Sequence, residues 1–429
     1  MKIWEKGYSI DRLVEDFTVG NDRIWDVRLA KYDIMASLAH AKMLQSINIL
    51  TPQELNLLDK ELNEMLLQIE QNGFEIEPIF EDVHSKIEYL LTQRLGEVGK
   101  KIHTGRSRND QVLVAVQLYL KDEILSIRQK IKRLFDELII LSEKHKDKLL
   151  VGYTHLQVAM PSSYALWLSA YAECLADDML FWNVAYQITD QNPLGSAAGY
   201  GTSIPLNRRM TTELLGFKTL KYNSVAAQMN RSKVEKTTAF AMASLAGTLA
   251  KLSMDVCLYM SQNFGFVSFP DQLTTGSSIM PHKKNPDVFE LIRAKCNRIQ
   301  NLPNEIMMMT TNLPSGYHRD YQILKEILFP ALDALNACLD IAIYMFPQMQ
   351  VKDNLLKDER YEYIFSVELV NEEVMKGVPF REAYRKIADS IANKTYKAPE
   401  KVEHTHEGSI GNLCLEQIKN KFENVFNHI

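Results

Sequence analysis

The chain is poor in cysteine, and the few cysteines that it has are scattered. Its 429 residues include five, with no CxxC spacing, at Cys174, Cys257, Cys296, Cys338 and Cys414. An odd and dispersed set predicts free thiols in a reducing compartment and argues against a disulfide framework or a zinc site. We therefore expect a cytoplasmic protein without a metal centre.

Other absences narrow the class of protein further. No uninterrupted apolar run approaches about 18 residues, so no membrane span is expected. The first residues, MKIWEKGYSIDRLVEDF, are charged and lack the apolar core of a signal peptide. The net charge of −5 provides no basic field of the kind that binds nucleic acid. The remaining composition, 46% hydrophobic and 24% charged, is typical of a soluble globular protein.

Glycine and proline are both absent between Gly105 and Gly152. Within this window apolar residues recur at alternating steps of three and four, at Leu113, Val116, Leu120, Ile124, Ile127, Ile131, Leu134, Leu138 and Leu141. This spacing predicts one long helix of roughly 40 Å or more. Asn109 or Asp110 is the expected N-cap.

Further helices are expected between Pro161 and Pro193, along the apolar stripe from Met242 to Tyr259, and after Pro286. The segment Thr51-Pro52-Gln53-Glu54 predicts a capping box that opens a shorter helix. The fold should be mostly α, with an N-terminal helical domain (1–106), a central long-helix bundle (107–355) and a small C-terminal helical domain (356–429). Because the apolar stripe of a long helix must pack against other helices, this pattern favours an oligomer whose helices share a core.

Residues 276–286, GSSIMPHKKNP, are the most specific stretch for function. Gly276 allows close approach to a ligand, consecutive N–H groups can form an anion nest, and Lys283 and Lys284 add positive charge. A serine beside them could act as a proton-abstracting base. A surface turn with solvated lysines would also fit this composition. The whole string resembles the signature loop of the fumarase/aspartase superfamily.

Two further motifs precede predicted helices. HTGRSRNDQ (103–111) places Arg106 and Arg108, whose forked donors suit a carboxylate, at a helix N-terminus. GYTHLQVAMP (152–161) places Thr154 and His155 in a turn bounded by glycine and proline. Taken singly, these motifs could equally be a capping turn and a structural histidine.

Together with GYHRDYQ (316–322), these motifs resemble the argininosuccinate lyase family within that superfamily. The resemblance runs from about residue 16 to about residue 384. It implies a three-domain fold with a tetrameric helical core, a homotetramer that needs no cofactor, and elimination of fumarate from argininosuccinate to leave arginine. In that reaction a base removes a C–H proton, and charge gathers on the adjacent carboxylate as an aci-carboxylate before the C–N bond breaks.

The resemblance also implies roles for individual residues. The catalytic set is Ser277 as base, His155, Glu290 as a carboxylate partner of that histidine, and Lys283. The implied substrate-binding set is Asp22, Ser107, Arg108, Asn109, Thr154, Asn285, Tyr317, Gln322 and Lys325. The acid that protonates the leaving nitrogen is left open among His155, Thr154 and a water.

The sequence departs from the family pattern at two places. Thr18 stands where the family has a serine, and Ala226 and Asn230 stand in segment 223–231 where acids are common. These departures leave a modified argininosuccinate open as substrate. An adenylosuccinate lyase would need purine and phosphate contacts, and a non-catalytic bundle should have lost the catalytic residues.

Overall fold

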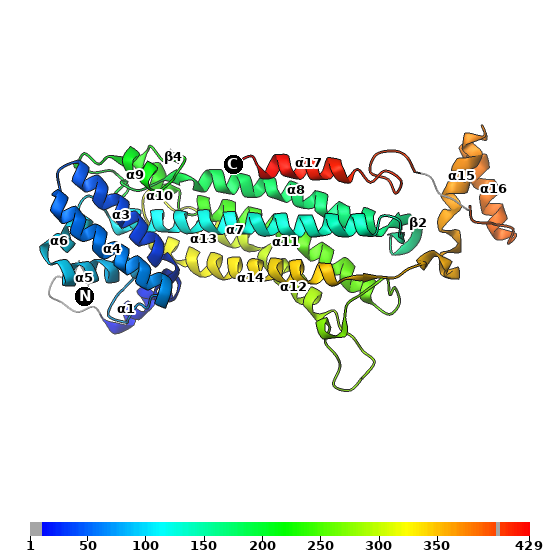
Figure 1. Ribbon diagram of the computed structural model, residues 1–429, viewed down its shortest axis with the longest axis horizontal. Helices are drawn as coiled ribbons and strands as arrows, with labels where there is room; N and C mark the ends of the chain where they lie inside the picture. Colours follow the sequence, from blue (N-terminus) through cyan, green and yellow to red (C-terminus); the bar gives the residue numbers. More distant parts are fainter. Residues whose placement is uncertain (1–10, 400–403) are drawn as a thin grey trace.

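A bundle of long helices forms the centre of the computed structural model, which describes residues 11–399 and 404–429 (Figure 1). The first ten residues, which include much of the charged N-terminal segment, lie outside the described part. The helices that build the bundle are α7 (Arg108–Lys144), α8 (Tyr164–Thr189), α11 (Lys233–Met260), α12 (Asp287–Ile299), α13 (Leu302–Met309) and α14 (Ile323–Met345). The mostly α fold and the predicted long helices are confirmed.

Helix α7 is the longest element, and its predicted apolar stripe is buried along its whole length. Its 37 residues correspond to roughly 55 Å. The predicted N-cap was wrong by two or three positions, because the cap is Ser107. The extended backbone of Ser107 lets its side chain accept from the Asn109 N–H, while Asp110 accepts from the Ser107 N–H at 2.9 Å. This capping box places Asn109 and Asp110 inside the first turn.

Shorter helices pack at one end of the bundle. Helix α4 begins with the predicted capping box, in which Thr51 and Glu54 cap each other, and Gly73 is its C-cap. The elements of this end are α1 (Arg12–Val19), α2 (Asp22–Asp26), η1 (Val27–Leu29), α3 (Ala30–Ser46), α4 (Pro52–Asn72), α5 (Val83–Leu95), α6 (Glu97–Lys100) and η2 (Lys101–His103). Helix α3 packs against α7, which joins this group to the bundle.

A β-hairpin joins α7 to α8, where the sequence predicted only a turn. Strands β1 (Leu149–Thr154) and β2 (Gln157–Ser163) pair antiparallel, with Thr154 opposite Gln157. The two residues between them, His155 and Leu156, form the turn. Two other sheets have strands of two residues each: β3 (Gln191–Asn192) with β4 (Thr219–Leu220), and β5 (Val267–Ser268) with β6 (Gln350–Val351).

The C-terminal part divides between two places. Helices α15 (Ser366–Met375) and α16 (Phe380–Ala392) form a small core of their own at the far end of the molecule. Helix α17 (Leu415–Phe426) returns to lie along α8 (Figure 1), and it also contacts α7, where its Phe422 stacks on Phe135 at 4.0 Å between ring centroids. The domain boundaries at residues 106 and 355 stay predictions.

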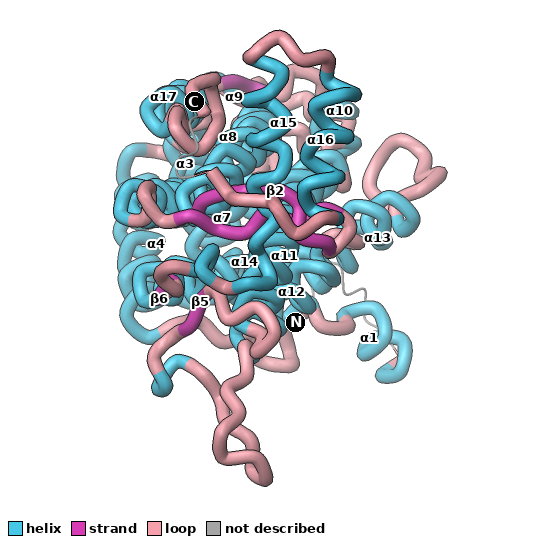
Figure 2. The backbone as a smooth tube through the Cα atoms, turned by 90° about the vertical axis from the view of Figure 1, so that its right-hand side faces the viewer, coloured by secondary structure: helices cyan, strands magenta, loops and turns pink. Residues whose placement is uncertain are grey.

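Two short helices and several connecting 3₁₀ turns complete the described chain. They are α9 (Arg208–Leu214), α10 (Ser224–Met229), η3 (Asp271–Leu273), η4 (Arg319–Gln322), η5 (Phe346–Gln348), η6 (Leu355–Lys357) and η7 (Glu359–Phe365). Residues 274–286 form a loop that projects from the side of the bundle, as the ribbon and the tube views both show (Figures 1 and 2).

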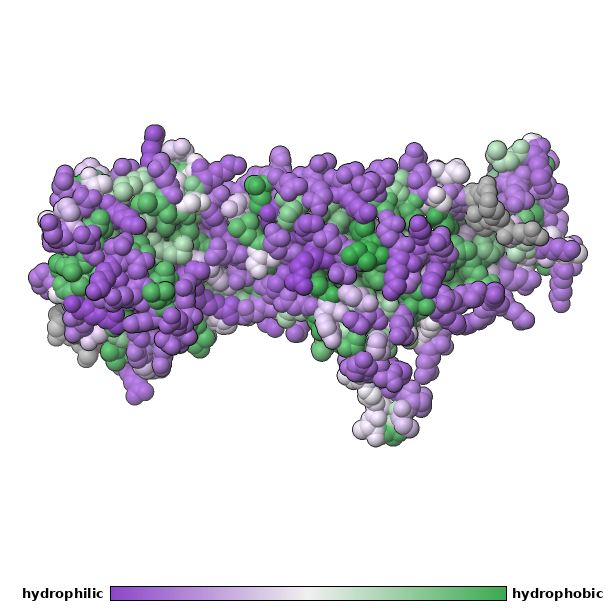
Figure 3. All heavy atoms as spheres, viewed as in Figure 1, coloured by the Kyte–Doolittle hydropathy of each residue, from purple (hydrophilic) through white to green (hydrophobic). Residues whose placement is uncertain are grey.

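The bundle carries apolar side chains on its outer surface as well as in its core. Leu180, Phe181 and Val184 of α8 are each 50% exposed, and apolar patches interrupt the polar surface (Figure 3). Two helical segments, 224–260 and 319–348, are long and apolar enough by composition to cross a membrane. Both are packed into the bundle, however, and core helices of soluble proteins meet the same criterion.

Candidate active site

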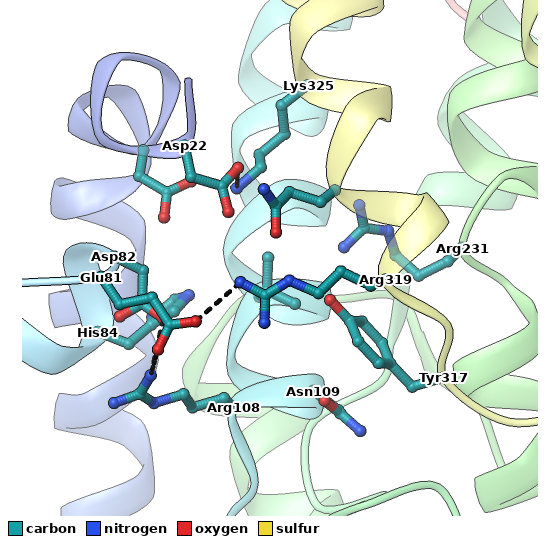
Figure 4. Close-up of a pocket in the computed structure, with 13 residues that line it drawn as sticks. Asp22, Glu81, Asp82, His84, Arg108, Asn109, Arg231, Tyr317, Arg319 and Lys325 are labelled. Atoms are coloured by element: carbon teal, nitrogen blue, oxygen red, sulfur yellow. Dashed lines mark hydrogen bonds and ion pairs between the residues drawn. The ribbon is translucent and has the colours of Figure 1, made fainter. Parts of the chain in front are cut away.

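A polar cavity of about 180 Å³ lies where the N-terminal helices meet the bundle (Figure 4). Its walls come from α2, from the start of α5, from the start of α7 and from η4 and α14. The lining residues are Asp22, Asp26, Glu81, Asp82, His84, Arg108, Asn109, Val112, Arg231, Tyr317, Arg319, Gln322 and Lys325. Six of the nine predicted substrate-binding residues are among them, although they come from widely separated parts of the sequence.

Lys325 is a deeply buried cation of this cavity. Its Nζ forms ion pairs with Asp22, at 2.7 Å, and with Asp26. Burial raises the pKa of Asp22 to about 7, with Lys325 opposing the shift and Asp26 adding to it. The Lys325 pKa is also raised, because the two carboxylates outweigh the burial that disfavours its charge. One ammonium group thus pairs with two carboxylates, and the raised pKa of Asp22 allows that carboxylate to change charge near neutral pH.

Two arginine side chains of the cavity share the carboxylate of Glu81, and Arg108 also donates to Asp82 at 3.2 Å. Glu81 accepts from Arg108 Nη1 at 3.1 Å and from Arg319 Nη2 at 2.8 Å, the contacts dashed in Figure 4. Gln322 Nε2 donates to the carbonyls of Thr18 and Val19, both at 3.0 Å, which ties η4 to the end of α1. The cavity therefore presents fixed charges of both signs, as a ligand with several charged groups requires.

Several lining residues were not predicted from the sequence. Among them His84 is buried, its Nδ1 lies 2.7 Å from Asp33 Oδ1, and its Nε2 has no hydrogen-bond partner within the described chain. Burial lowers the pKa of His84, but Asp33, Asp82 and Asp26 together outweigh it, so the pKa is raised. The sequence did carry one sign of these acidic lining residues, the pair Glu81-Asp82 at the start of a helix, in which Asp82 is the N-cap. Their proximity to Arg108 is decided by packing alone.

The loop of residues 276–286 lies elsewhere, at the junction of α11 and α12. Ser277 Oγ accepts from the backbone N–H groups of Ile279 and Met280, at 3.3 and 3.1 Å. The antiparallel bridge between Thr275 and Asn285 closes the base of the loop. A second cavity, of about 430 Å³, borders it and is lined by Lys283, Asn285 and Glu290 together with residues of α11.

Thr154 and His155 occupy a third place, the exposed tip of the β1–β2 hairpin. Glu290, the expected partner of His155, is exposed at the start of α12 and pairs with Arg293 at 4.0 Å. Ser107, predicted to touch substrate, uses its side chain to cap α7. One chain therefore holds the predicted residues in three separate groups. In the described part of the chain, no cluster of three or more His, Cys, Asp or Glu side chains could hold a metal ion.

Comparisons with known proteins agree with this arrangement of elements. A family model described as lyase matches residues 7–301. The solved structure of EDDS lyase in complex with formate superposes with a TM-score of 0.77 at 21% identity, covering 97% of this chain and 90% of that chain. Class II fumarase from Schistosoma mansoni gives a TM-score of 0.71 at 17% identity, with 97% and 95% covered. The fold and the family match define a lyase of the fumarase/aspartase superfamily.

Sequence relatives narrow the class. A protein of Parabacteroides distasonis named argininosuccinate lyase is 55% identical over 417 residues, covering 97% of this chain and 94% of the relative. One of Thermotoga neapolitana with the same name is 40% identical over 393 residues, covering 92% and 99%. The chain belongs to the argininosuccinate lyase family of carbon–nitrogen lyases.

Proposed function

We propose that this chain converts argininosuccinate to fumarate and arginine. The observation that carries the proposal is the composition of the first cavity, where Asp22, Arg108, Asn109, Tyr317, Gln322 and Lys325 line one space. These are the residues that the family resemblance assigns to the substrate. A cavity with fixed carboxylates and guanidinium groups suits a ligand that carries amino, guanidino and carboxylate groups together.

The base in this proposal is Ser277. Its Oγ already accepts two backbone N–H groups, and such donors stabilise a negatively charged oxygen. Removal of a C–H proton next to a carboxylate places a second negative charge on that carboxylate. Lys283 and the amide of Asn285 lie on the same loop, where they can meet this charge as it develops. One such donor is typically worth about 3 kcal/mol in the transition state, so these groups matter more than the intrinsic strength of the base.

The elimination then ends with cleavage of the C–N bond. The electron pair of the dianion forms the double bond of fumarate, and the leaving guanidino nitrogen takes a proton. His155, Thr154 and a water are the candidates for that acid, and Glu290 is proposed to orient His155. No cofactor takes part in these steps.

We further propose that the site is shared between chains of a cytoplasmic homotetramer. The three groups of site residues occupy the first cavity, the loop of residues 276–286 and the hairpin tip, and the last two are largely exposed. Apolar side chains such as Phe181, Phe240 and Leu291 are also exposed on the bundle helices, where a neighbouring copy would cover them. Neither nucleic acid nor a membrane is a proposed partner.

The test is an assay of fumarate release with the purified protein. Argininosuccinate should be turned over, and adenylosuccinate at the same concentration should not. Equal or faster release from adenylosuccinate would reject the proposed substrate, and release from neither would reject the proposed function. Appearance of arginine in equal amounts checks that the C–N bond is the one broken.

A further inference from the structure

A third cavity, of about 240 Å³, lies where α12 and α13 pack against α14. Its floor is apolar, with Ile299 and Leu302 on one side and Ile327 on the other. The α14 side of the lining extends from Glu326 to Ala334, about 12 Å of helix. The proposed substrate-binding and catalytic residues all lie in the described part of the chain, and none of them lines this cavity. It is therefore separate from the proposed site.

Charged side chains of opposite sign lie at the two ends of the third cavity. Lys295 and Arg298 come from α12, whereas Glu305 comes from α13, which lies nearer to the N-terminal helices (Figure 1). Glu326 is at the same end as Glu305, because it lies in the first turn of α14 and its Oε2 accepts from Asn21 at 3.1 Å. The side chains of Lys295, Arg298 and Glu305 are exposed and form no hydrogen bond or ion pair within the described chain. An apolar floor thus separates two cations from two carboxylates.

A proline adds one more acceptor at the acidic end. Pro330 lies inside α14 and has no N–H, so the carbonyl of Glu326 lacks the donor that it would have in a regular helix. Both residues line the third cavity. A backbone carbonyl without its helical partner needs another donor. Two carboxylates and one carbonyl oxygen are therefore available to a cation that has several N–H groups.

We propose that the third cavity binds a guanidino acid, a molecule whose carboxylate and guanidinium group are joined by methylene groups, and that free arginine is such a ligand. Its carboxylate pairs with Lys295 and Arg298, and its methylene stem lies on the apolar floor. Its guanidinium group donates to Glu305 and Glu326, because forked donors bind several acceptors at once better than an ammonium group does. The α-ammonium group of arginine is not needed for this binding, since the described lining has no carboxylate at the basic end.

The third cavity is linked to the first through α14. Lys325 and Glu326 are adjacent, yet Lys325 lines the first cavity and Glu326 the third. Asn21, which donates to Glu326, is the N-cap residue of α2, and Asp22 follows it. A guanidinium group bound to Glu326 competes with Asn21 for the same carboxylate. Occupancy of the third cavity should therefore release Asn21 from α14 and weaken substrate binding beside Asp22. This kinetic consequence rests on the proposed function, whereas the binding site does not.

The arginine analogue that lacks the α-amino group tests the site by calorimetric titration. It should bind the wild-type protein, and Arg298→Gln and Glu305→Gln should each raise its Kd at least about tenfold, because each removes a charge-assisted contact. The matched control is Arg133→Gln, since Arg133 is exposed on α7 and lines none of the three cavities. This control should keep the wild-type Kd. Absence of binding, an unchanged Kd in Arg298→Gln, or an equal loss in Arg133→Gln would overturn the proposal.

Kinetics with the same analogue test the link between the two cavities. The KM for argininosuccinate should rise about fivefold or more and then reach a plateau, because a ligand at a separate site weakens substrate binding by a finite factor. Arg298→Gln and Glu305→Gln should need at least about tenfold more analogue for the same effect and should keep wild-type kcat and KM without it. A KM that rises without limit would place the analogue in the first cavity and would overturn the proposal. If the wild-type protein turns over no argininosuccinate, the proposed function fails, while the titration still decides the site.

Discussion

At the scale of single residues, Ser277 illustrates how a loop can prepare an ordinary side chain for proton abstraction. Its hydroxyl oxygen accepts two backbone N–H groups, whereas the neighbouring Ser278 is exposed and accepts no such pair within the described chain. Both serines lie in the same loop, beside the same lysines. Comparing substitutions of the two serines therefore distinguishes loss of the proposed base from a general disturbance of the loop.

Ser277→Ala should lower kcat by several orders of magnitude and leave substrate binding and folding intact. The reason is that the alanine removes the proposed base and no ion pair. Ser278→Ala is the control and should keep most of the activity. Steady-state kinetics of fumarate release and a binding titration with argininosuccinate check both variants. Near-normal turnover in Ser277→Ala would reject this residue as the base.

Asp22 provides a prediction about pH. Because burial raises its pKa to about 7, Asp22 is ionised above that pH and neutral below it. We propose that Asp22 meets the α-ammonium group of bound arginine, which only the ionised carboxylate attracts. Inhibition by arginine should therefore weaken as pH falls from about 8 to about 6, by up to about tenfold per pH unit below the pKa.

Asp22→Asn cannot ionise, so its inhibition by arginine should be weak and nearly independent of pH over this range. The inhibition constant of arginine, measured for both proteins across the range, checks the prediction. If the inhibition depended equally steeply on pH in Asp22→Asn, another group would cause the pH dependence. His84 is the first candidate in the cavity.

At the scale of elements, the start of α7 connects helix capping with the site. The capping box of Ser107 and Asp110 fixes the turn, and the next residues, Arg108 and Asn109, line the first cavity. Asp110 also accepts from the N–H groups of Gly195 and Ala197, at 3.0 and 2.9 Å, which holds the loop of residues 193–207, between β3 and α9, against this turn. The cap therefore supports both the helix and the position of two proposed binding residues.

Ser107→Ala and Thr51→Ala remove the same kind of N-cap at two helices. Each should lower stability by about 1 kcal/mol, because each leaves backbone N–H groups without a partner. Only Ser107→Ala should also lower kcat/KM, since α4 contributes no residue to the cavity. Thermal unfolding and kinetics of both variants provide the comparison. If kcat/KM falls equally in both, the loss reflects stability and the proposed role of the α7 cap in the site is wrong.

At the scale of the whole molecule, two features favour an oligomer. One is the separation of the site residues into three groups, and the other is the exposed apolar surface of the bundle. The loop of residues 276–286 projects from the bundle, and the hairpin tip lies at the end remote from the N-terminal helices (Figure 1). Neither group lines the first cavity. A shared site in an oligomer would join groups that one chain keeps apart.

Mixed oligomers test directly whether the site is shared between chains. His155→Asn and Ser277→Ala should each be inactive alone, because each lacks one proposed catalytic group at every site. After the two variants are refolded together, some sites should receive His155 and Ser277 from different intact chains, and part of the wild-type activity should return. Verified mixed oligomers that stay as inactive as their parents would contradict the shared site.

The sequence by itself determined the helices and the side chains that each motif places next to one another. The stripe of α7 and the Thr51 capping box were readable because they depend on neighbours three or four positions away. Ser277, Lys283 and Asn285 were readable because one short loop carries all three. The Ser107 cap was missed by a few positions, since several adjacent polar residues can cap and only the backbone angles choose among them.

Only the tertiary structure decided which distant residues meet. Packing alone brings four further residues to the cavity from the start of α5, the turn before α11 and η4: Glu81, His84, Arg231 and Arg319. Such contacts leave no periodic trace in the sequence. The β1–β2 hairpin was missed for a related reason. Its turn, His155-Leu156, lacks the glycine or asparagine that normally marks a two-residue hairpin turn. Pairing of the strands on either side holds the turn in a conformation that its own residues do not favour.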